Sequence, residues 1–255
     1  YKVRRSKISH IFISHLHGDH YFGLIGLLNS MSLLGHNQPI ELFAPPPLKE
    51  ILDIQLRVSD TMLGFDLNFH PITEASILVD TNALRIRCFP TDHRIPCFGF
   101  SFEEQRLPRK LIPEKARAYG IPTSYYERLV RGESYTTKNG ELISVELVTE
   151  PAAPGPKYAF CADTRYHESL IEHIEGFDLI YHESTYLDDL ADRAYDRYHS
   201  TSKQAAELAR KAEVKRLLLG HFSSKYAKLD EFAQEARSIF PNTDLALEGL
   251  CYPIR

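Results

Sequence analysis

Short runs of β-branched and aromatic residues recur along the chain, and a polar turn follows each of them. The runs cover residues 7–14, 40–45, 84–90, 157–163, 178–184 and 216–222. Such runs predict buried β-strands, because the pleated surface of a strand favours branched and aromatic side chains. Helical patterns lie between them, at residues 24–34, 46–58, 203–214 and 229–239. Since strands and helices are mixed along the chain, the pattern predicts an α/β protein.

The stretch from about residue 103 to residue 155 has a different character. It is interrupted by prolines and glycines at positions 108, 113, 120, 122, 132, 140, 151 and 154. Because Pro and Gly punctuate regular elements, we interpret it as an inserted arm that projects from a single domain spanning residues 1–255. From Glu103 to Lys138 there are eight basic and five acidic residues, whereas the whole chain has a net charge of −4.

The composition excludes several classes of protein. Of the 255 residues, 43% are hydrophobic and 25% are charged, which is typical of a globular protein with a sizeable core. No run approaches the roughly 18 apolar residues of a membrane-spanning helix, and the N-terminus lacks the apolar segment of a secretory signal. We therefore expect a cytoplasmic protein with no membrane partner. The cysteines form no CxxC pair, so we interpret all four as small buried residues: Cys88, Cys97, Cys161 and Cys251.

The clearest chemical signal is a run of ligand-type residues directly after the first predicted strand. It has the form HxHxDH and spans His15 to His20. Residues two apart in an extended chain point to the same side, so His15 and His17 can converge on one metal ion. Gly18 allows a sharp bend, after which Asp19 and His20 are available to a second ion. A single histidine in a turn is commonly structural, but four ligand types in six positions favour a metal site.

Three further candidate ligands each lie just past a predicted strand. They are His93, Asp163 and His221. The ends of strands are where α/β folds place their ligands. For each residue taken alone, a structural role with a hydrogen bond to the backbone is the alternative. Together with HxHxDH, their order is what two zinc sites need.

This order of residues resembles the metallo-β-lactamase superfamily, in which HxHxDH is followed by a lone His, an Asp and a final His. The resemblance covers about residues 7–253 and implies an αββα sandwich. It also implies a centre of two Zn²⁺ ions per chain. One ion would be held by His15, His17 and His93. The other would be held by Asp19, His20 and His221, and Asp163 would bridge the two.

Within that superfamily the chain resembles the tRNase Z family. FCADTR at 160–165 is similar to the GDTR segment of that family, HEST at 182–185 to its HEAT loop, HST at 199–201 to its HST loop, and GHFSSKY at 220–226 to its GHxSxRY motif. The chain departs from the family at three positions, because Ala162 replaces glycine, Ser184 replaces alanine and Lys225 replaces arginine. Members of the family begin with strands upstream of the position of Tyr1, so we expect N-terminal strands to precede this sequence.

The resemblance implies a zinc-dependent endoribonuclease that hydrolyses a phosphodiester at the 3′ end of precursor tRNA. Asp19 would orient or deprotonate the attacking water. His199 would donate a proton to the leaving ribose oxygen, and Glu183 would fix the tautomer of His199. The alternative for this pair is structural: Glu183 would pair with Arg or Lys, and His199 would cap the helix that begins near Thr201.

The arm contains another family-like segment, GIPTSYYERLVRG at 120–132, which is similar to GIPPGPLYxxLKxG but lacks its Pro-Gly-Pro. The resemblance implies that the arm binds RNA and that the protein is a homodimer whose arms serve the partner's site. Candidate RNA contacts are Tyr125, Tyr126, Arg128 and Arg131, through stacking and phosphate binding. The alternative is a solvated hairpin that only packs a dimer.

Two other functions stay open from the sequence. The first is a phosphodiesterase of the same fold that acts on small or cyclic phosphodiesters, although the HST and HEST segments count against it. The second is a binding or scaffold protein that has lost its metals. Such a protein normally loses ligands, whereas every ligand position is filled here.

Overall fold

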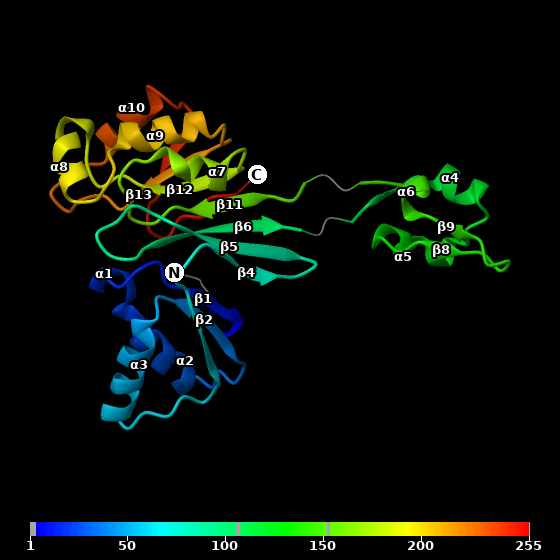
Figure 1. Ribbon diagram of the computed structural model, residues 1–255, viewed down its shortest axis with the longest axis horizontal. Helices are drawn as coiled ribbons and strands as arrows, with labels where there is room; N and C mark the ends of the chain where they lie inside the picture. The colour runs from blue at the N-terminus through cyan, green and yellow to red at the C-terminus, as the bar shows by residue number, and fades with distance from the viewer. Residues whose placement is uncertain (1–3, 106–107, 152–153, 255) are drawn as a thin grey trace. The chain divides into compact units, whose positions relative to one another are not determined.

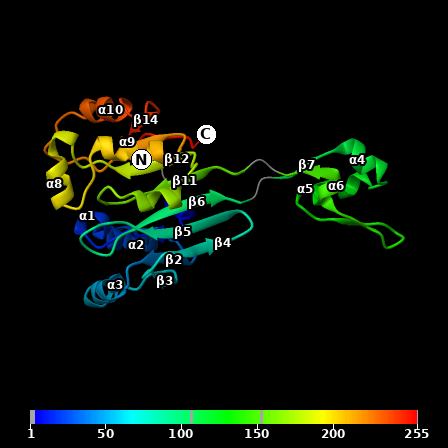
Figure 2. The same ribbon diagram turned by 45° about the horizontal axis from the view of Figure 1, so that its top comes forward.

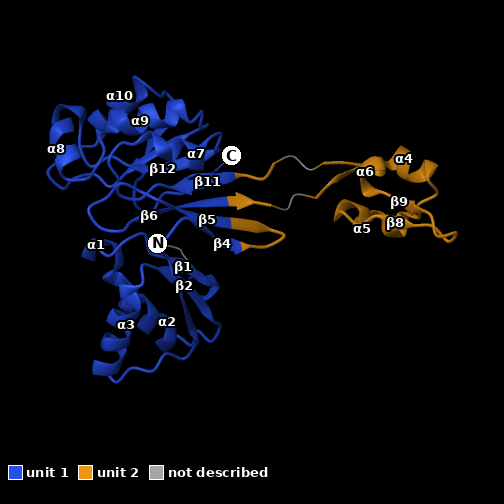
Figure 3. Cartoon of the chain, in the orientation of Figure 1, with its two compact units in different colours: residues 1–79, 86–102, 157–255 blue, residues 80–85, 103–156 orange. Residues whose placement is uncertain are grey.

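The computed structural model describes residues 4–105, 108–151 and 154–254 (Figure 1). The chain divides into two compact units (Figure 3). The first comprises Tyr1–Val79, Ile86–Phe102 and Lys157–Arg255, and the second comprises Asp80–Arg85 and Glu103–Pro156. The arm expected at residues 103–155 lies within the second unit.

The larger sheet has seven strands, which lie side by side in the order β14-β13-β12-β11-β6-β5-β4. Strands β11, β12, β13 and β14 are parallel neighbours, with Tyr158 opposite Leu179, Ile180 opposite Leu217 and Leu217 opposite Thr243. Their carboxyl ends therefore meet at one edge of the sheet. The bounds are β4 Ser76–Asp80, β5 Leu84–Pro90, β6 Phe98–Glu104, β11 Lys157–Phe160, β12 Leu179–Glu183, β13 Leu217–Gly220 and β14 Thr243–Leu245.

A second, smaller sheet is parallel throughout and consists of β1 (His10–Phe12), β2 (Ile40–Ala44) and β3 (Leu67–Pro71). The two faces of β2 alternate as the two-residue period of a strand requires. Ile40, Leu42 and Ala44 pack with α2 (Gly23–Leu33) and α3 (Pro47–Val58), whereas Phe43 packs in a different cluster. One face of the small sheet is thus covered by helices.

Aromatic side chains from the two sheets share one buried cluster. Phe43 of the small sheet packs there with Cys88, Phe98 and Phe100 of the large sheet. The ring centroids of Phe12 and Phe100 are 5.4 Å apart. These contacts bury the inner faces of both sheets against each other, as in other sheet sandwiches.

Helices cover the outer face of the large sheet (Figures 1 and 2). Leu208 and Ala209 of α9 (Ser202–Lys211) and Ala236 of α10 (Asp230–Arg237) belong to a core cluster with Ile180 and Leu217 of the sheet. The layers therefore run helix, sheet, sheet, helix, which confirms the αββα sandwich expected from the resemblance. The remaining short helices of this unit are η1 Arg5–Lys7, α1 Gly18–Tyr21, η3 Glu168–Leu170, α7 Ile171–Ile174, η4 Asp188–Leu190 and α8 Ala191–Asp196.

The predicted strands and helices are all present, with shifted ends. The helix predicted at 203–214 begins at Ser202 because Thr201 is its N-cap: the Thr201 side chain accepts from the backbone of Gln204, and the Gln204 side chain accepts from the backbone of Thr201. In the two main sheets, four strands were not predicted, namely β3, β4, β6 and β14, and the two-residue strands of the second unit were not predicted either. At Gly18 the chain turns from extended backbone at His17 into helix α1. A Cβ at Gly18 would lie 2.2 Å from the ring of Phe22, whose side chain is exposed.

The second unit has a hydrophobic core of its own, formed by Ala116, Ile121, Leu129, Ile143, Val145 and Val148. Tyr125 and Tyr126 are half-buried against this core, and the Tyr125 hydroxyl donates to the carbonyl of Ser134 at 3.1 Å. The elements of the unit are β7 Lys110–Leu111, α4 Pro113–Ala118, η2 Thr123–Tyr125, α5 Tyr126–Val130, β8 Tyr135–Thr136, β9 Leu142–Ile143, α6 Val145–Val148 and β10 Thr149–Glu150.

The charge of this unit is balanced. The basic excess between Glu103 and Lys138 is cancelled by Glu141, Glu146 and Glu150, so the unit carries nine basic and nine acidic residues. Arg128 pairs with Glu133 at 2.7 Å, and Arg131 pairs with Glu127. Arg106, which contributes to the basic excess, lies outside the described residues.

The cysteines are free thiols. Cys88, Cys97 and Cys161 are buried as predicted, but Cys251 is exposed, so its prediction is wrong. It lies in the irregular segment that follows the last strand, β14, where no element covers it. Among the described residues, no helix is long and apolar enough to cross a membrane.

Candidate metal centre

All seven predicted metal ligands meet at one edge of the first unit. The segments after β1, β5, β11 and β13 carry them, with Asp19 and His20 in the short helix α1, so both sheets contribute. The ligand atoms of His15, His17, His93 and Asp163 lie within 4.8 Å of one another. The same holds for the set Asp19, His20 and His221, and for the set Asp163, His199 and His221.

One carboxylate oxygen stands at the middle of this cluster. Asp163 Oδ2 lies 3.4 Å from Nε2 of both His20 and His221, 3.7 Å from His15 Nε2 and 4.0 Å from His93 Nε2. Two ligands of a tetrahedral zinc ion, each bonded at about 2.0–2.1 Å, are separated by about 3.3–3.4 Å. The spacing around Asp163 therefore fits a carboxylate shared between metal ions.

The charge states of Asp163 and His15 also suit a metal site. Burial acts to raise the pKa of Asp163, but the hydrogen bond from His20 and the charges of His221, His20 and His15 outweigh it and hold that pKa well below its usual range. Burial lowers the pKa of His15 to about 3. Asp163 is thus an anion and His15 a neutral imidazole, which are the forms that bind metal.

In His93 and His221, a hydrogen bond at the far side of the ring leaves a lone pair facing the centre. His93 Nδ1 donates to the carbonyl of Tyr198 at 2.9 Å, because a carbonyl can only accept. His221 Nδ1 lies 2.8 Å from Thr185 Oγ1, whose own proton goes to Glu183 Oε2 at 2.7 Å, so Thr185 accepts from His221. Such partners orient the histidine ligands of metal sites. His15 Nε2 is buried with no hydrogen-bond partner, an orphan that a metal ion would satisfy.

His17 is held differently from the other rings. Its Nε2 lies 3.2 Å from Nη2 of Arg94, which can only donate, and its Nδ1 lies 3.1 Å from His93 Nε2. In this arrangement the ring proton of neutral His17 is on Nδ1. Binding a metal through Nδ1 would move that proton to Nε2, and the contact with Arg94 would be lost.

Buried Glu183 and half-buried His199 form a pair next to this cluster. His199 Nδ1 lies 2.8 Å from Glu183 Oε1. The other contacts of the carboxylate are the backbone N–H of Thr164 at 3.0 Å and, at 3.0 and 2.7 Å, the backbone N–H and hydroxyl of Thr185. Burial acts to lower the pKa of His199, but the hydrogen bond and charge of Glu183 outweigh it and raise the pKa.

The structural alternative for this pair is therefore wrong. In the described part of the chain, the ion-pair partner of Glu183 is His199 and not an arginine or lysine. The helix that begins at Ser202 is capped by Thr201. His199 Nδ1 is hydrogen-bonded to Glu183. The other ring nitrogen of His199, Nε2, is therefore the one that can act on a ligand.

Three residues of the site loops have left-handed backbone. The φ angles are 47° at Ala162, 62° at Tyr198 and 57° at His221. This region costs a residue with a Cβ about 1–2 kcal/mol relative to the right-handed region. Ala162 is the position where the resembling family has glycine, which adopts it without that cost.

The sequence did not indicate several residues that support the centre. Arg165 packs its guanidinium 4.1 Å from the Tyr195 ring centroid and 3.5 Å from that of Tyr198, and it donates to the carbonyl of Tyr195. It thereby fixes the segment that presents the Tyr198 carbonyl to His93. Cys97 Sγ lies 3.5 Å from His15 Nδ1, and burial raises its thiol pKa to about 12, so it is not a thiolate ligand.

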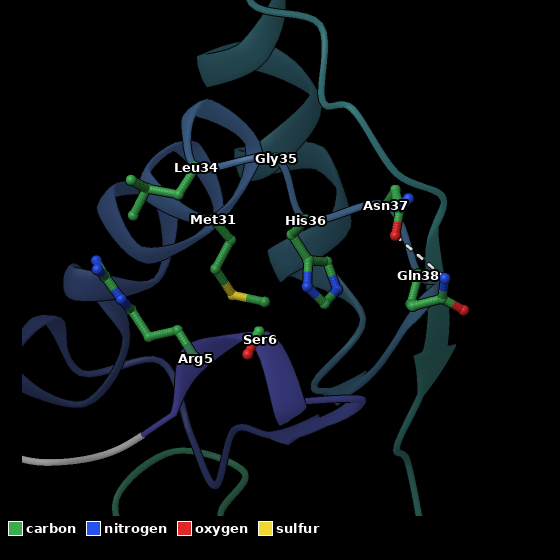
Figure 4. Close-up of a pocket in the computed structure, with 8 residues that line it drawn as sticks. All are labelled: Arg5, Ser6, Met31, Leu34, Gly35, His36, Asn37 and Gln38. Carbon is green, nitrogen blue, oxygen red and sulfur yellow. Dashed lines mark hydrogen bonds between the residues drawn. The ribbon is translucent and has the colours of Figure 1, made fainter.

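A separate pocket lies between η1 and the end of α2 (Figure 4). Figure 4 shows Met31 and His36 pointing into it, with Arg5 and Ser6 opposite. None of the predicted site residues lines it. The chemistry of the candidate centre does not involve this pocket.

Comparison with known proteins gives similarities over nearly the whole chain. The Beta-lactamase superfamily domain matches residues 2–108 and 129–222. Ribonuclease Z of Bacteroides thetaiotaomicron is 38% identical over 255 residues, which cover 99% of this chain and 81% of that protein. Ribonuclease Z of Cytophaga hutchinsonii is 43% identical over 239 residues, which cover 91% and 75%. The crystal structure of human tRNase Z, short form, is similar with a TM-score of 0.70 and 25% identity, and the match covers 100% of this chain and 82% of that one.

The contact between Thr185 and His221 generates a prediction. Thr185→Val keeps the shape of the side chain but removes the acceptor of His221 Nδ1 and one donor to Glu183. We expect Zn²⁺ affinity to fall about 10- to 100-fold, as is typical when a partner of a metal ligand is lost. Competition with a chelating dye measures this affinity. Thr185→Ser keeps the hydroxyl and should bind Zn²⁺ like the unaltered protein. Equal affinity in the valine variant would contradict the role of Thr185.

Proposed function

The chain belongs to the ribonuclease Z family of the β-lactamase superfamily, and we propose that the cluster around Asp163 is its catalytic centre. Members of this family are metal-dependent endoribonucleases, and the chain is a hydrolase of this kind, acting in tRNA 3′ processing. The observation that carries the assignment of the site is one buried carboxylate oxygen facing four imidazoles, with the Glu183–His199 pair beside it.

We propose that the centre holds two Zn²⁺ ions per chain. His15, His17 and His93 would hold one ion, and Asp19, His20 and His221 the other, with Asp163 shared between them. The orphaned His15 Nε2 and the spacing around Asp163 support this assignment. Imidazole and carboxylate are the ligands that catalytic zinc sites prefer.

When bound, zinc would supply Lewis acidity toward the phosphate and lower the pKa of water toward neutrality. The chain itself supplies the proton transfers. Asp19, whose carboxylate is mostly exposed and lies 3.4 Å from His20 Nε2, would orient the attacking water. His199 would donate the proton of Nε2 to the leaving ribose 3′-oxygen. Glu183 would keep the other ring proton on Nδ1 and stabilise the imidazolium form of His199.

We further propose a cytoplasmic homodimer whose arms bind the body of precursor tRNA. The similarity of residues 120–132 to a family segment supports this role. The charge of the arm does not, because its acidic and basic residues balance. Arg128 and Arg131 would have to leave their glutamate partners to reach phosphate. In the described part of the arm, no ion pair occupies Lys115 or Lys138, which are better placed to bind phosphate as they stand.

The assignment of the centre is tested with three substrates: a precursor tRNA, bis-(p-nitrophenyl) phosphate and cyclic AMP. We expect site-specific cleavage of the tRNA, slower hydrolysis of the small diester and little action on the cyclic one. Asp163→Ala should lose bound metal and all hydrolysis together, because both ions lose a ligand and its charge. The exposed Asp66→Ala serves as the control. Full metal content and normal rates in Asp163→Ala would remove Asp163 from the centre, and preference for cyclic AMP would favour the small-diester alternative.

The acid role of His199 gives a second prediction. His199→Ala should slow tRNA cleavage by about 10²- to 10⁴-fold, the usual contribution of a general acid. The defect should shrink with bis-(p-nitrophenyl) phosphate, because p-nitrophenolate leaves without a proton. Metal content, measured by elemental analysis, should stay the same. His10→Ala, which alters an exposed histidine, is the matched control. An equal loss on both substrates would argue against proton donation.

Replacing residues 103–155 by a short Gly-Ser loop tests the arm. Since the arm packs around its own core, we expect the metal centre to survive the replacement. The KM for precursor tRNA should rise at least tenfold, while hydrolysis of bis-(p-nitrophenyl) phosphate persists. Loss of both activities in a folded, metal-loaded protein would assign the arm to the catalytic machinery instead.

A further inference from the structure

A strongly basic pocket opens directly beside the candidate metal centre. Its volume is about 300 Å³, roughly ten times the share of one water molecule in the liquid. This is room for a phosphate group and the sugar attached to it. The lining contains no acidic side chain and consists of His17, His93, Arg94, Tyr186, Arg193, Arg197 and His199.

The three arginines of this pocket lack charge partners. Among the residues that the structure describes, none of their guanidinium groups forms an ion pair with a carboxylate. Arg193 in α8 and Arg197, directly after α8, are four residues apart and lie on the same side of the helix. Arg94 enters from the loop after β5, where it contacts His17. Three cations converging without an anion repel one another, which favours an anionic ligand.

The position of the pocket restricts that ligand. Two of its histidines, His17 and His93, are proposed metal ligands, and the third, His199, is the proposed acid. A group bound in this pocket is therefore a neighbour of the reacting phosphate. In RNA, the neighbour of one backbone phosphate is the next one along the strand. Arginine suits this ligand because its planar group binds phosphate through two parallel hydrogen bonds.

The contact between Arg94 and His17 also supports a phosphate ligand in this pocket. The present partner of Arg94 is the lone pair of His17 Nε2, at 3.2 Å. If His17 held a metal ion through Nδ1, its Nε2 would carry the ring proton and would no longer accept. The guanidinium of Arg94 would then be available to an anion in the pocket.

We propose that Arg94, Arg193 and Arg197 bind the backbone phosphate adjacent to the scissile bond. The inference rests on the proposed function, since it needs the centre around Asp163 to be the site of cleavage. It makes the pocket a determinant of substrate class: ligands with two consecutive phosphates on one strand gain affinity, and isolated diesters do not. The preference for RNA over bis-(p-nitrophenyl) phosphate then has a local source in addition to the arm.

The test uses the zinc-loaded protein and the double variant Arg193→Gln/Arg197→Gln. Its matched control is Arg210→Gln, which removes a positive charge from an exposed position of α9. Calorimetry measures binding of adenosine 3′,5′-bisphosphate and of adenosine 5′-monophosphate. We expect the double variant to bind the bisphosphate at least tenfold more weakly, with a much smaller change for the monophosphate. The control should bind both like the unaltered protein.

Kinetics provide the second measurement. The KM for precursor tRNA should rise about tenfold or more. The loss of kcat/KM with bis-(p-nitrophenyl) phosphate should be at least tenfold smaller than the loss of kcat/KM with precursor tRNA. The slope of log(kcat/KM) against log salt should become shallower by about 0.7–0.9, the contribution of one neutralised phosphate. Unchanged bisphosphate affinity, or equal losses on both substrates, would overturn the proposal. If the unaltered protein failed to cleave precursor tRNA, the proposed function would fall, while the calorimetry would still decide whether the pocket binds a second phosphate.

Discussion

A buried carboxylate facing several imidazoles is stable only where its charge is matched, and the architecture around Asp163 meets this requirement. The four histidines near Asp163 Oδ2 come from loops after strands of both sheets. The aromatic cluster between the sheets, which includes Phe43 and Phe100, therefore supports the centre as well as the fold. Removing an unpaired charge from water costs several kcal/mol, so the loops and the carboxylate depend on each other.

A second carboxylate joins the proposed metal ligands to the proposed acid. Glu183 contacts His199 on one oxygen and Thr185 on the other, and Thr185 in turn accepts from His221. The backbone also connects the two groups. Tyr198 directly precedes His199, and the carbonyl of Tyr198 accepts a hydrogen bond from His93. The orientation of a metal ligand and the orientation of the acid are thus set by the same short segments. A change in either segment should alter the orientation of both the proposed ligand and the proposed acid.

The sequence was sufficient to predict which ligand-type residues gather at the candidate centre, but not the residues that support them. Ligand-type side chains that directly follow buried strands are rare, and here they occur in a characteristic order along the chain. This order made it possible to predict HxHxDH, His93, Asp163 and His221. The contacts of Tyr198 and Arg165 could not, since one uses a backbone carbonyl and the other depends on two rings brought together by folding. Strand β3 contains His70 and Pro71, and β14 is three residues long, so neither gave a clear pattern. The arginine pocket escaped prediction because Arg94 is about one hundred residues from α8 in the sequence.

The self-contained core of the second unit bears on how such enzymes diverge. Ala116, Leu129 and Val148 pack with each other and with other residues of the same unit. Mutations that reshape its surface are therefore shielded from the strained loops that carry Ala162 and His221. Thr123, Ser124 and Tyr125 in place of Pro-Gly-Pro can therefore stand beside a complete set of candidate metal ligands, because the two lie on separate hydrophobic cores.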